Sequence, residues 1–178
     1  AEGVVDYAAE QNVDLIVNSL RDLPGYRLLL MSRISDAERA RLTALAPEGS
    51  VVFYDGASDE DYEAAMLGAT ALVTASRDEG FGLPVVEAQA LGTPVLLSDI
   101  PIFREIGGPA AGYFDPESTA SFVAAVRELE DPAEWERRSA EAARAALRFN
   151  WPDAAKQLLE VLTETHERRT HERRRAGR

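Results

Sequence analysis

The sequence predicts an α/β fold built on a doubly wound, Rossmann-like parallel sheet. Short apolar runs alternate along the chain with longer amphipathic stretches, which is the pattern of repeated strand–helix units. The apolar runs show no period of two, as expected for strands that helices cover on both faces. Cap residues precede several amphipathic stretches and mark where helices begin. A chain of 178 residues is long enough for one such domain.

Each strand is predicted from a short run of β-branched or apolar residues. In chain order the clear runs lie at residues 26–31, 51–54, 71–74, 93–97 and 111–114, and a weaker run lies at 3–7. Because no comparable run follows residue 114, we expect the sheet to end there. The helices that follow must then pack outside the sheet.

Helices are predicted from the amphipathic stretches between and after the strands. Ser35, Ser58 and Asp131 stand at three of the predicted starts, where their side chains can cap the first turn. Pro132 suits a first turn because its missing N–H needs no partner there. The predicted helices lie at residues 12–22, 36–46, 59–68, 84–91, 118–130, 133–147 and 152–168.

Composition and charge exclude several functional classes. The 19 basic and 31 acidic residues give a net charge of −12, which disfavours general nucleic-acid binding because the chain repels phosphate backbones. The absence of cysteine excludes disulfides, Cys-ligated zinc, iron–sulfur clusters and a thiol nucleophile. No apolar run approaches the roughly 20 residues of a spanning helix, and no signal segment is recognised at the start. We expect a cytoplasmic protein, with contact at the inner face of the membrane as the alternative.

Residues 166–178 form a separate compositional block. They carry six Arg and two Glu, whereas residues 1–165 carry 13 basic and 29 acidic side chains. We therefore divide the chain into a domain at 1–165, which includes the closing helices, and a charged Arg-rich tail at 166–178. The tail is interpreted as a solvated helix end, with a patch for anionic lipid headgroups or a partner as the alternative. His166 and His171 both lie in it, which excludes a Ser-His-Asp hydrolase.

One segment, at residues 76–94, differs from ordinary strand–helix material because it combines a glycine-rich turn with a helix start. Gly80 and Gly82 are expected to let the backbone turn tightly and approach a ligand, and Pro84 suits the first turn of the following helix. Free N–H groups of that turn, together with the helix dipole, make an anion site. The turn follows a strand, and ligands of open α/β sheets bind at the carboxyl ends of strands.

Two carboxylates, Glu79 and Glu87, flank this turn at a spacing of eight residues. Carboxylates accept hydrogen bonds from hydroxyl groups. A diphosphate on the helix N-terminus, with one sugar held by each carboxylate, is therefore one interpretation. The alternative is a plain glycine turn with a glutamate that the helix dipole favours.

The string EGFGLPVVEAQALGTPVLLSDIPIFREI, at residues 79–106, resembles the C-terminal domain of retaining GT-B glycosyltransferases, family 4 (glycosyl transferases group 1). The E-x7-E pair, the GFGLP turn and the later YFDPES and FNW segments, at 113–118 and 149–151, carry the resemblance over about residues 10–165. It implies that the sheet is one half of a GT-B fold.

The resemblance also implies roles for individual residues. Glu79 would contact the transferred sugar and act in catalysis, and Glu87 would hold the ribose of the nucleotide. Backbone N–H groups of the turn would meet the sugar hydroxyls and the diphosphate. The family needs no structural metal and no cofactor beyond a UDP-, GDP- or ADP-linked sugar donor. The turn residues concerned are Gly80, Phe81, Gly82 and Leu83.

The sequence departs from the family where an Arg and a Lys usually neutralise the diphosphate. In the register set by Asn12, Asp6 replaces the Arg and Gln11 replaces the Lys. Arg33 is a candidate replacement cation for the diphosphate, with a solvated loop arginine as the alternative. Arg77 and Arg104 are further candidates, with pairing to nearby Asp78 or Glu105 as their alternative.

The predicted function is therefore that of the donor domain of a hexosyltransferase that acts on a sugar or lipid-linked acceptor in glycan biosynthesis. The chain has room for only one of the two GT-B domains, so we expect an N-terminal acceptor domain or partner chain to complete it. The fragment alone is expected to be inactive. The alternative is a degenerate, non-catalytic domain with an assembly or regulatory role. A nicotinamide- or flavin-binding Rossmann protein is disfavoured because no G-x-G-x-x-G opens the first unit.

Overall fold

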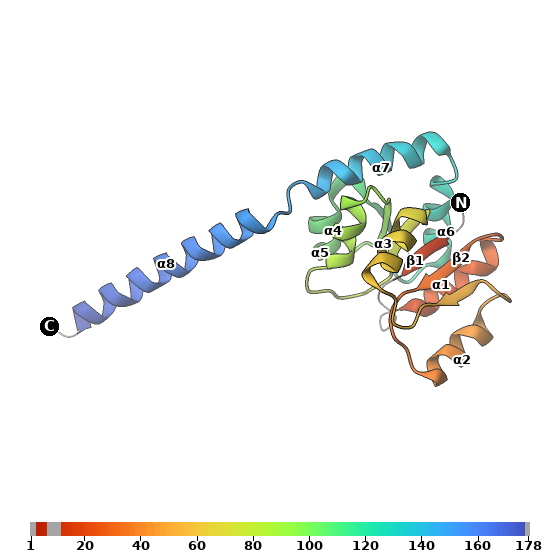
Figure 1. The fold of residues 1–178 in the computed structure, drawn as a ribbon, viewed down its shortest axis with the longest axis horizontal. Coiled ribbons are helices and arrows are strands. Elements are labelled where there is room, and N and C mark those ends of the chain that lie inside the picture. Colours follow the sequence, from red (N-terminus) through yellow and green to blue (C-terminus); the bar gives the residue numbers. More distant parts are fainter. Residues whose placement is uncertain (1–2, 7–11, 177–178) are drawn as a thin grey trace. The chain divides into compact units, whose positions relative to one another are not determined.

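A computed structural model of the chain describes residues 3–6 and 12–176, with side chains described for 12–168 (Figure 1). The chain divides into two compact units, at residues 1–146 and 147–178. The predicted limit of the donor domain at residue 165, with a separate tail at 166–178, stays a proposal.

The described residues of the first unit form a six-stranded sheet in the order β3-β2-β1-β4-β5-β6. Every neighbouring pair of strands is parallel. The order runs outward from β1 in one direction and from β4 in the other, which confirms the doubly wound fold. The strands are β1 Gly3–Asp6, β2 Arg27–Leu30, β3 Val51–Phe53, β4 Ala71–Thr74, β5 Val95–Ser98 and β6 Gly112–Phe114.

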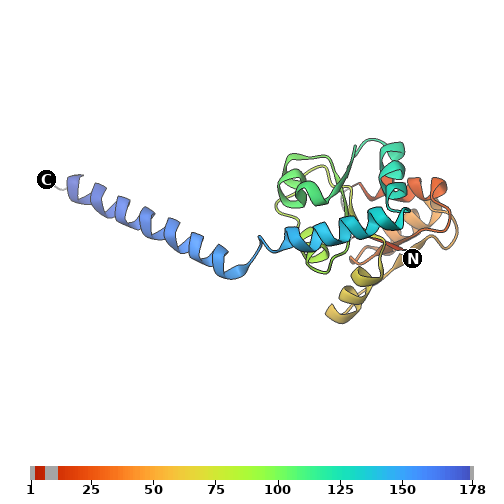
Figure 2. The same cartoon turned by 90° about the horizontal axis from the view of Figure 1, so that it is seen from above.

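Helices cover the sheet in two layers. Helix α1 packs against α2 and α6, and α4 packs against α5 and α7. Because crossovers between parallel strands are right-handed, the reversal of strand order places the two groups on opposite faces (Figures 1 and 2). The bounds are α1 Val13–Ser19, η1 Leu20–Asp22, α2 Asp36–Leu45, α3 Asp59–Gly68, α4 Leu83–Ala90, α5 Pro101–Gly107, η2 Gly108–Ala110, α6 Thr119–Glu128 and α7 Pro132–Ala146.

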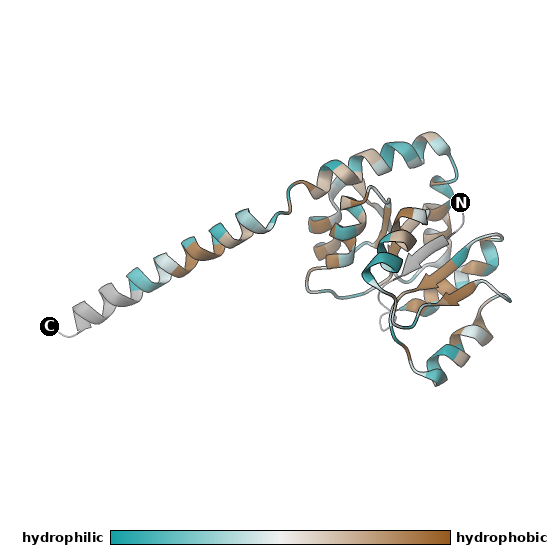
Figure 3. Ribbon diagram, viewed as in Figure 1, coloured by the Kyte–Doolittle hydropathy of each residue, from teal (hydrophilic) through white to brown (hydrophobic). Residues whose placement is uncertain are grey.

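The core follows the predicted strands. All four residues of β4 and of β5 are buried, which is why these runs lack alternation. Figure 3 shows β2 largely in brown, whereas the helices mix apolar and polar turns. Trp135 of α7 packs against this core, and its indole N–H donates to the Thr70 carbonyl at 2.8 Å.

The predicted caps are confirmed. Ser35 accepts a hydrogen bond from the N–H of Glu38, and Ser58 forms a reciprocal capping box with Asp61. Asp131 accepts from the N–H of Ala133 at the start of α7. The weak run at 3–7 becomes β1, which lies inside the sheet between β2 and β4.

The sequence prediction missed α5, which begins at Pro101 directly after the loop that follows β5. With seven residues, this helix is too short to give a clear amphipathic period.

The second unit, taken by itself, contains α8, Trp151–Ala176. Its apolar side chains are exposed, namely Trp151, Leu158, Leu159, Val161 and Leu162. Within the described residues, no helix is both long and apolar enough to cross a membrane.

Candidate donor-binding site

The predicted turn follows β4 and opens α4. Gly82 is the N-cap of α4 and has φ of 82°, a left-handed conformation that favours glycine. A Cβ atom at Gly82 would also lie 3.2 Å from Cε1 of Phe103, which is fully buried. Glycine is therefore needed here for two independent reasons, backbone conformation and close packing.

Gly80 plays a different part from the one predicted. Its φ is not positive, and nothing lies within 4 Å of the position that a Cβ would take. The tight turn is therefore made at Gly82 and not at Gly80. The open space around Gly80 leaves its backbone accessible.

Helix α4 begins at Leu83, in the segment that follows β4, and its first turn therefore lies at the carboxyl edge of the sheet. Pro84, its second residue, has no N–H to satisfy. The side chains of Phe81 and Leu83 are 41% and 54% exposed. The N–H groups of this first turn have no helical partners, and the positive end of the helix dipole lies beside them. The exposed apolar side chains of Phe81 and Leu83 are next to these groups.

Two carboxylates of the loop that carries Glu79 accept hydrogen bonds from backbone N–H groups of the same loop. The N–H of Gly80 donates to Oε1 of Glu79 at 2.9 Å, and the N–H of Glu79 donates to Oδ1 of Asp78 at 3.1 Å. Glu79 is partly exposed, so a ligand hydroxyl can reach its remaining lone pairs.

Glu87 is exposed on α4, about one turn inside the helix, as predicted. Its Oε2 accepts a hydrogen bond of 3.0 Å from the hydroxyl of Tyr62 on α3. Sequence reasoning missed Tyr62, because the two residues are 25 positions apart and no local motif links them.

Asn12 joins the loops around this turn. Its backbone has φ of 67°, and its side-chain amide donates to the carbonyls of Ala75, after β4, and Pro116, after β6. Asp6 is the last residue of β1, which pairs with β4. The strand order reverses between these two strands, and such a reversal is where open α/β sheets bind ligands. Gln11 lies outside the described residues.

The predicted partners of two arginines are wrong. Arg77 makes a bidentate pair with Glu117, at 2.5 and 3.2 Å, instead of pairing with Asp78. Arg104 pairs with Asp99 at 2.6 and 2.7 Å instead of Glu105. Hydrogen bonds from these guanidinium groups lower the pKa values of Glu117 and Asp99. Both cations are therefore already engaged by carboxylates.

Arg33 lies after β2 and is exposed. Its Nη2 lies 3.7 Å from the position that a Cβ would take at Gly56, in the loop after β3. No hydrogen bond or ion pair of Arg33 is found within the described part of the chain. The structure therefore leaves Arg33 available, but directs it toward the β3 side of the sheet, away from Glu79.

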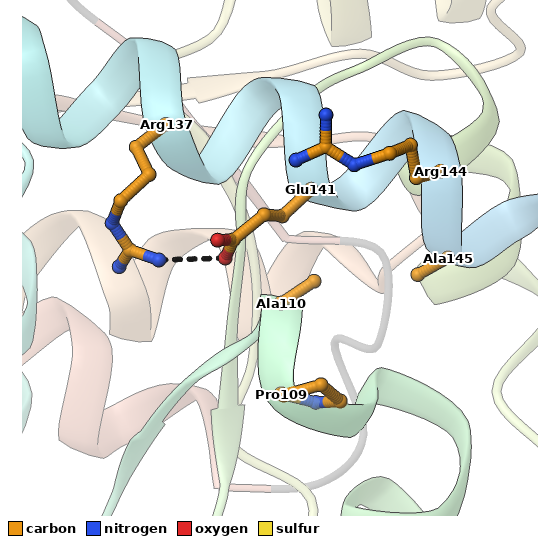
Figure 4. A pocket seen from close by; sticks show the side chains of 6 residues that line it. All are labelled: Pro109, Ala110, Arg137, Glu141, Arg144 and Ala145. Atoms are coloured by element: carbon orange, nitrogen blue, oxygen red, sulfur yellow. Dashed lines mark hydrogen bonds and ion pairs between the residues drawn. The ribbon is translucent and has the colours of Figure 1, made fainter.

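A separate hollow of about 560 Å³ lies between η2 and α7 (Figure 4). Arg137 and Glu141 form an ion pair of 2.6 Å across its wall. Because η2 leads into β6, this hollow lies toward the amino-terminal edge of the sheet. None of the predicted site residues lines it; its lining consists of Pro109, Ala110, Arg137, Glu141, Arg144 and Ala145. Among residues 12–168, no group of three or more His, Asp or Glu side chains is arranged to hold a metal ion.

The glycine turn and the two carboxylates thus lie beside the switch point of a doubly wound parallel sheet, where α/β domains of this kind bind ligands. The sequence profile of the family "Glycosyl transferases group 1" matches residues 6–146, so the chain belongs to that family.

Individual relatives agree with this assignment. A glycogen synthase of Deinococcus radiodurans is 30% identical over 166 residues, which is 86% of this chain and 36% of that protein. The O-antigen chain mannosyltransferase RfbU of Salmonella typhimurium is 47% identical over 62 residues, 35% of this chain and 18% of that protein. Anabaena Alr3699/HepE, solved in complex with UDP and glucose, superimposes with a TM-score of 0.80 at 19% identity, over 91% of this chain and 48% of that chain. The chain thus spans less than half the length of each of these proteins.

Proposed function

We propose that this chain is the donor-binding half of a retaining, family 4 hexosyltransferase that uses a UDP-, GDP- or ADP-linked sugar. The observation that carries the proposal is the Gly82 turn, which places the first turn of α4 between Glu79 and Glu87 at the switch point of the sheet. The mannosyltransferase and glycogen synthase relatives support a hexose as the transferred sugar.

In the proposed complex the diphosphate rests against the first turn of α4. Backbone N–H groups from Gly80 to Leu83 and the helix dipole face its negative charge. The Gly80 N–H exchanges its hydrogen bond to Glu79 for one to the ligand in this proposal. Glu87 accepts hydrogen bonds from the ribose, and Glu79 accepts them from the donor sugar. The Anabaena protein solved with UDP and glucose supports a nucleotide and a sugar in this fold.

The proposed reaction breaks the bond between the anomeric carbon of the sugar and the diphosphate oxygen. The acceptor hydroxyl oxygen forms the new bond with retained configuration, and its proton passes to the departing diphosphate oxygen. Because charge develops on the departing diphosphate, fixed N–H dipoles near it lower the barrier. Arg33 is the proposed cation of this site, since Arg77 and Arg104 are held by Glu117 and Asp99. To reach the diphosphate, the Arg33 side chain must turn away from the loop after β3.

An N-terminal acceptor domain or a partner chain is proposed to complete the enzyme, so the chain alone is expected to bind donor but not to turn it over. The longer relatives support this view. Placement in the cytoplasm, or at the inner face of the membrane, stays a prediction from the sequence.

A second candidate is a non-catalytic domain with an assembly or regulatory role. The position of Asp6 favours it, because Asp6 ends the strand beside the switch point where the family pattern has an arginine. An acid beside a leaving diphosphate disfavours charge development there.

Calorimetric titration of the chain with UDP, GDP and ADP, with and without magnesium, tests the proposal. We expect saturable binding of one nucleotide, at least tenfold weaker in Glu87→Ala and unchanged in Glu136→Ala, which removes an exposed glutamate of α7. Absence of binding at millimolar concentration of all three nucleotides contradicts the proposal and favours the non-catalytic candidate. In an active full-length protein, Glu79→Gln is expected to lower turnover by orders of magnitude, and near-normal turnover removes its catalytic role.

A further inference from the structure

The contact between Tyr62 and Glu87 joins two helices on the same side of the sheet. The hydroxyl of Tyr62, on α3, donates to one carboxylate oxygen of Glu87, on α4, at 3.0 Å. Tyr62 is half-buried, whereas Glu87 is exposed. An exposed glutamate is thus held at one carboxylate oxygen by a half-buried tyrosine.

Helix α3 is fixed at both ends. At its start, the N–H of Asp61 donates to the Ser58 hydroxyl at 3.1 Å, and the N–H of Ser58 donates back to Asp61 at 3.2 Å. At its end, Met66 is buried and its carbonyl accepts from the hydroxyl of Thr93, which follows α4. The Tyr62 ring therefore projects from a helix that is tied to the region around α4.

We propose that Tyr62 is a positioning residue that orients the Glu87 carboxylate toward the nucleotide. The inference rests on the proposed function and adds a residue to it. A carboxylate has two oxygens, each able to accept about two hydrogen bonds. The tyrosine hydroxyl occupies Oε2 of Glu87 and restricts rotation of the Glu87 side chain. Oε1 is then presented to the ribose hydroxyls. Less side-chain entropy is lost when the nucleotide binds, because the carboxylate is already ordered.

A second tyrosine provides a matched control. Burial, together with the nearby Glu130 carboxylate, raises the pKa of the Tyr26 hydroxyl. Tyr26 directly precedes β2 and therefore lies at the amino-terminal edge of the sheet, opposite to the candidate site. Replacing either tyrosine by phenylalanine removes one hydroxyl beside a glutamate and keeps the ring.

The test is calorimetric titration of the 178-residue chain and its variants with UDP, GDP and ADP. For the nucleotide that the unsubstituted chain binds, Tyr62→Phe is expected to weaken affinity about 3- to 10-fold, the size of one hydrogen bond. Tyr26→Phe is expected to leave affinity unchanged. In the Glu87→Ala background, Tyr62→Phe is expected to have no further effect, because its action passes through Glu87.

Each other outcome overturns the inference in a distinguishable way. If the chain binds a nucleotide and Tyr62→Phe binds it equally well, the positioning role is wrong and the proposed function stands. If Tyr62→Phe weakens binding as much in the Glu87→Ala background, Tyr62 does not act through Glu87. If no nucleotide binds the unsubstituted chain, the proposed function fails together with the inference. Urea unfolding of Tyr62→Phe shows whether the variant is folded.

Discussion

The side-chain amide of Asn12 donates a 2.7 Å hydrogen bond to the carbonyl of Pro116, 104 positions further along the chain. The same amide donates to the carbonyl of Ala75 at 3.2 Å. Asn12 also stands at the N-cap position of α1, without a side-chain cap hydrogen bond, and its backbone is left-handed, a conformation that asparagine tolerates better than most residues. One side chain thus links the loops after β4 and β6 to the start of α1, around the candidate donor site.

Asn12→Ala is therefore expected to lower the free energy of unfolding by about 3 kcal/mol, from two lost hydrogen bonds and the left-handed φ. Asn12→Gly loses the same hydrogen bonds but adopts φ of 67° freely, so we expect a smaller loss of about 1–2 kcal/mol. Urea unfolding measures both. Equal losses in the two variants would contradict the conformational part of the argument.

Gly82 and Gly80 are expected to respond differently to the same substitution. Gly82→Ala should cost about 2 kcal/mol or more, because it forces a left-handed alanine and brings a Cβ within 3.2 Å of the buried Phe103 ring. Gly80→Ala should change stability by no more than about 0.5 kcal/mol, since its Cβ meets open space. Thermal and urea unfolding of the two variants decide the matter. Similar losses at both positions are not compatible with the turn described.

Arg33 and Arg27 stand near opposite ends of β2, and both are exposed. If Arg33 turns toward a bound diphosphate, Arg33→Ala should weaken nucleotide binding about 3- to 10-fold at low salt, and less at high salt. Arg27→Ala removes the same charge at the far edge of the sheet and should leave affinity unchanged. If the two substitutions weaken nucleotide binding equally, the effect comes from the change in net charge, and the role proposed for Arg33 is wrong.

Glu134 is expected to contribute to the acid sensitivity of the fold. Hydrogen bonds from Arg137 and Arg138 lower its pKa from 4.5 to about 2. Because the pKa of Glu134 is lower in the folded state than in the unfolded chain, the ionised carboxylate stabilises the fold above pH 4.5. This contribution to the free energy of unfolding is lost as the pH falls toward 2. Glu134→Gln should therefore flatten the decrease in stability between pH 4.5 and 2, as measured by urea unfolding at each pH. Glu136→Gln is the control; parallel curves for Glu134→Gln and the unsubstituted chain would refute the assignment.

The strands and most helices were predictable because their signals are local. Buried strands appear in the sequence as short apolar runs. The caps at Ser35, Ser58 and Asp131 mark helix starts through contacts with residues two or three positions away, so they do not depend on distant parts of the chain. Helix α5 was not predictable, since one short helix that begins with Pro101 has almost no period of its own.

The carboxylates and glycines of the candidate site could be named from the sequence, but their contacts could not. Glu79, Gly82 and Glu87 stand in one short stretch, whereas the partners that decide their surroundings come from distant elements. Arg77 reaches Glu117 because the loops after β4 and β6 both lie at the carboxyl edge of the parallel sheet. No rule about sequence neighbours predicts that pairing. The contact from Tyr62 to Glu87 likewise depends on how α3 lies along the sheet.

An amide NMR titration of the 19.4 kDa chain with the nucleoside diphosphate that it binds tests the proposed location of the donor site most directly. We expect the largest chemical-shift changes on residues 76–83 and on Glu87, with smaller changes near Tyr62 and Arg33. Shift changes confined to the hollow between η2 and α7, around Arg137 and Arg144, would contradict it.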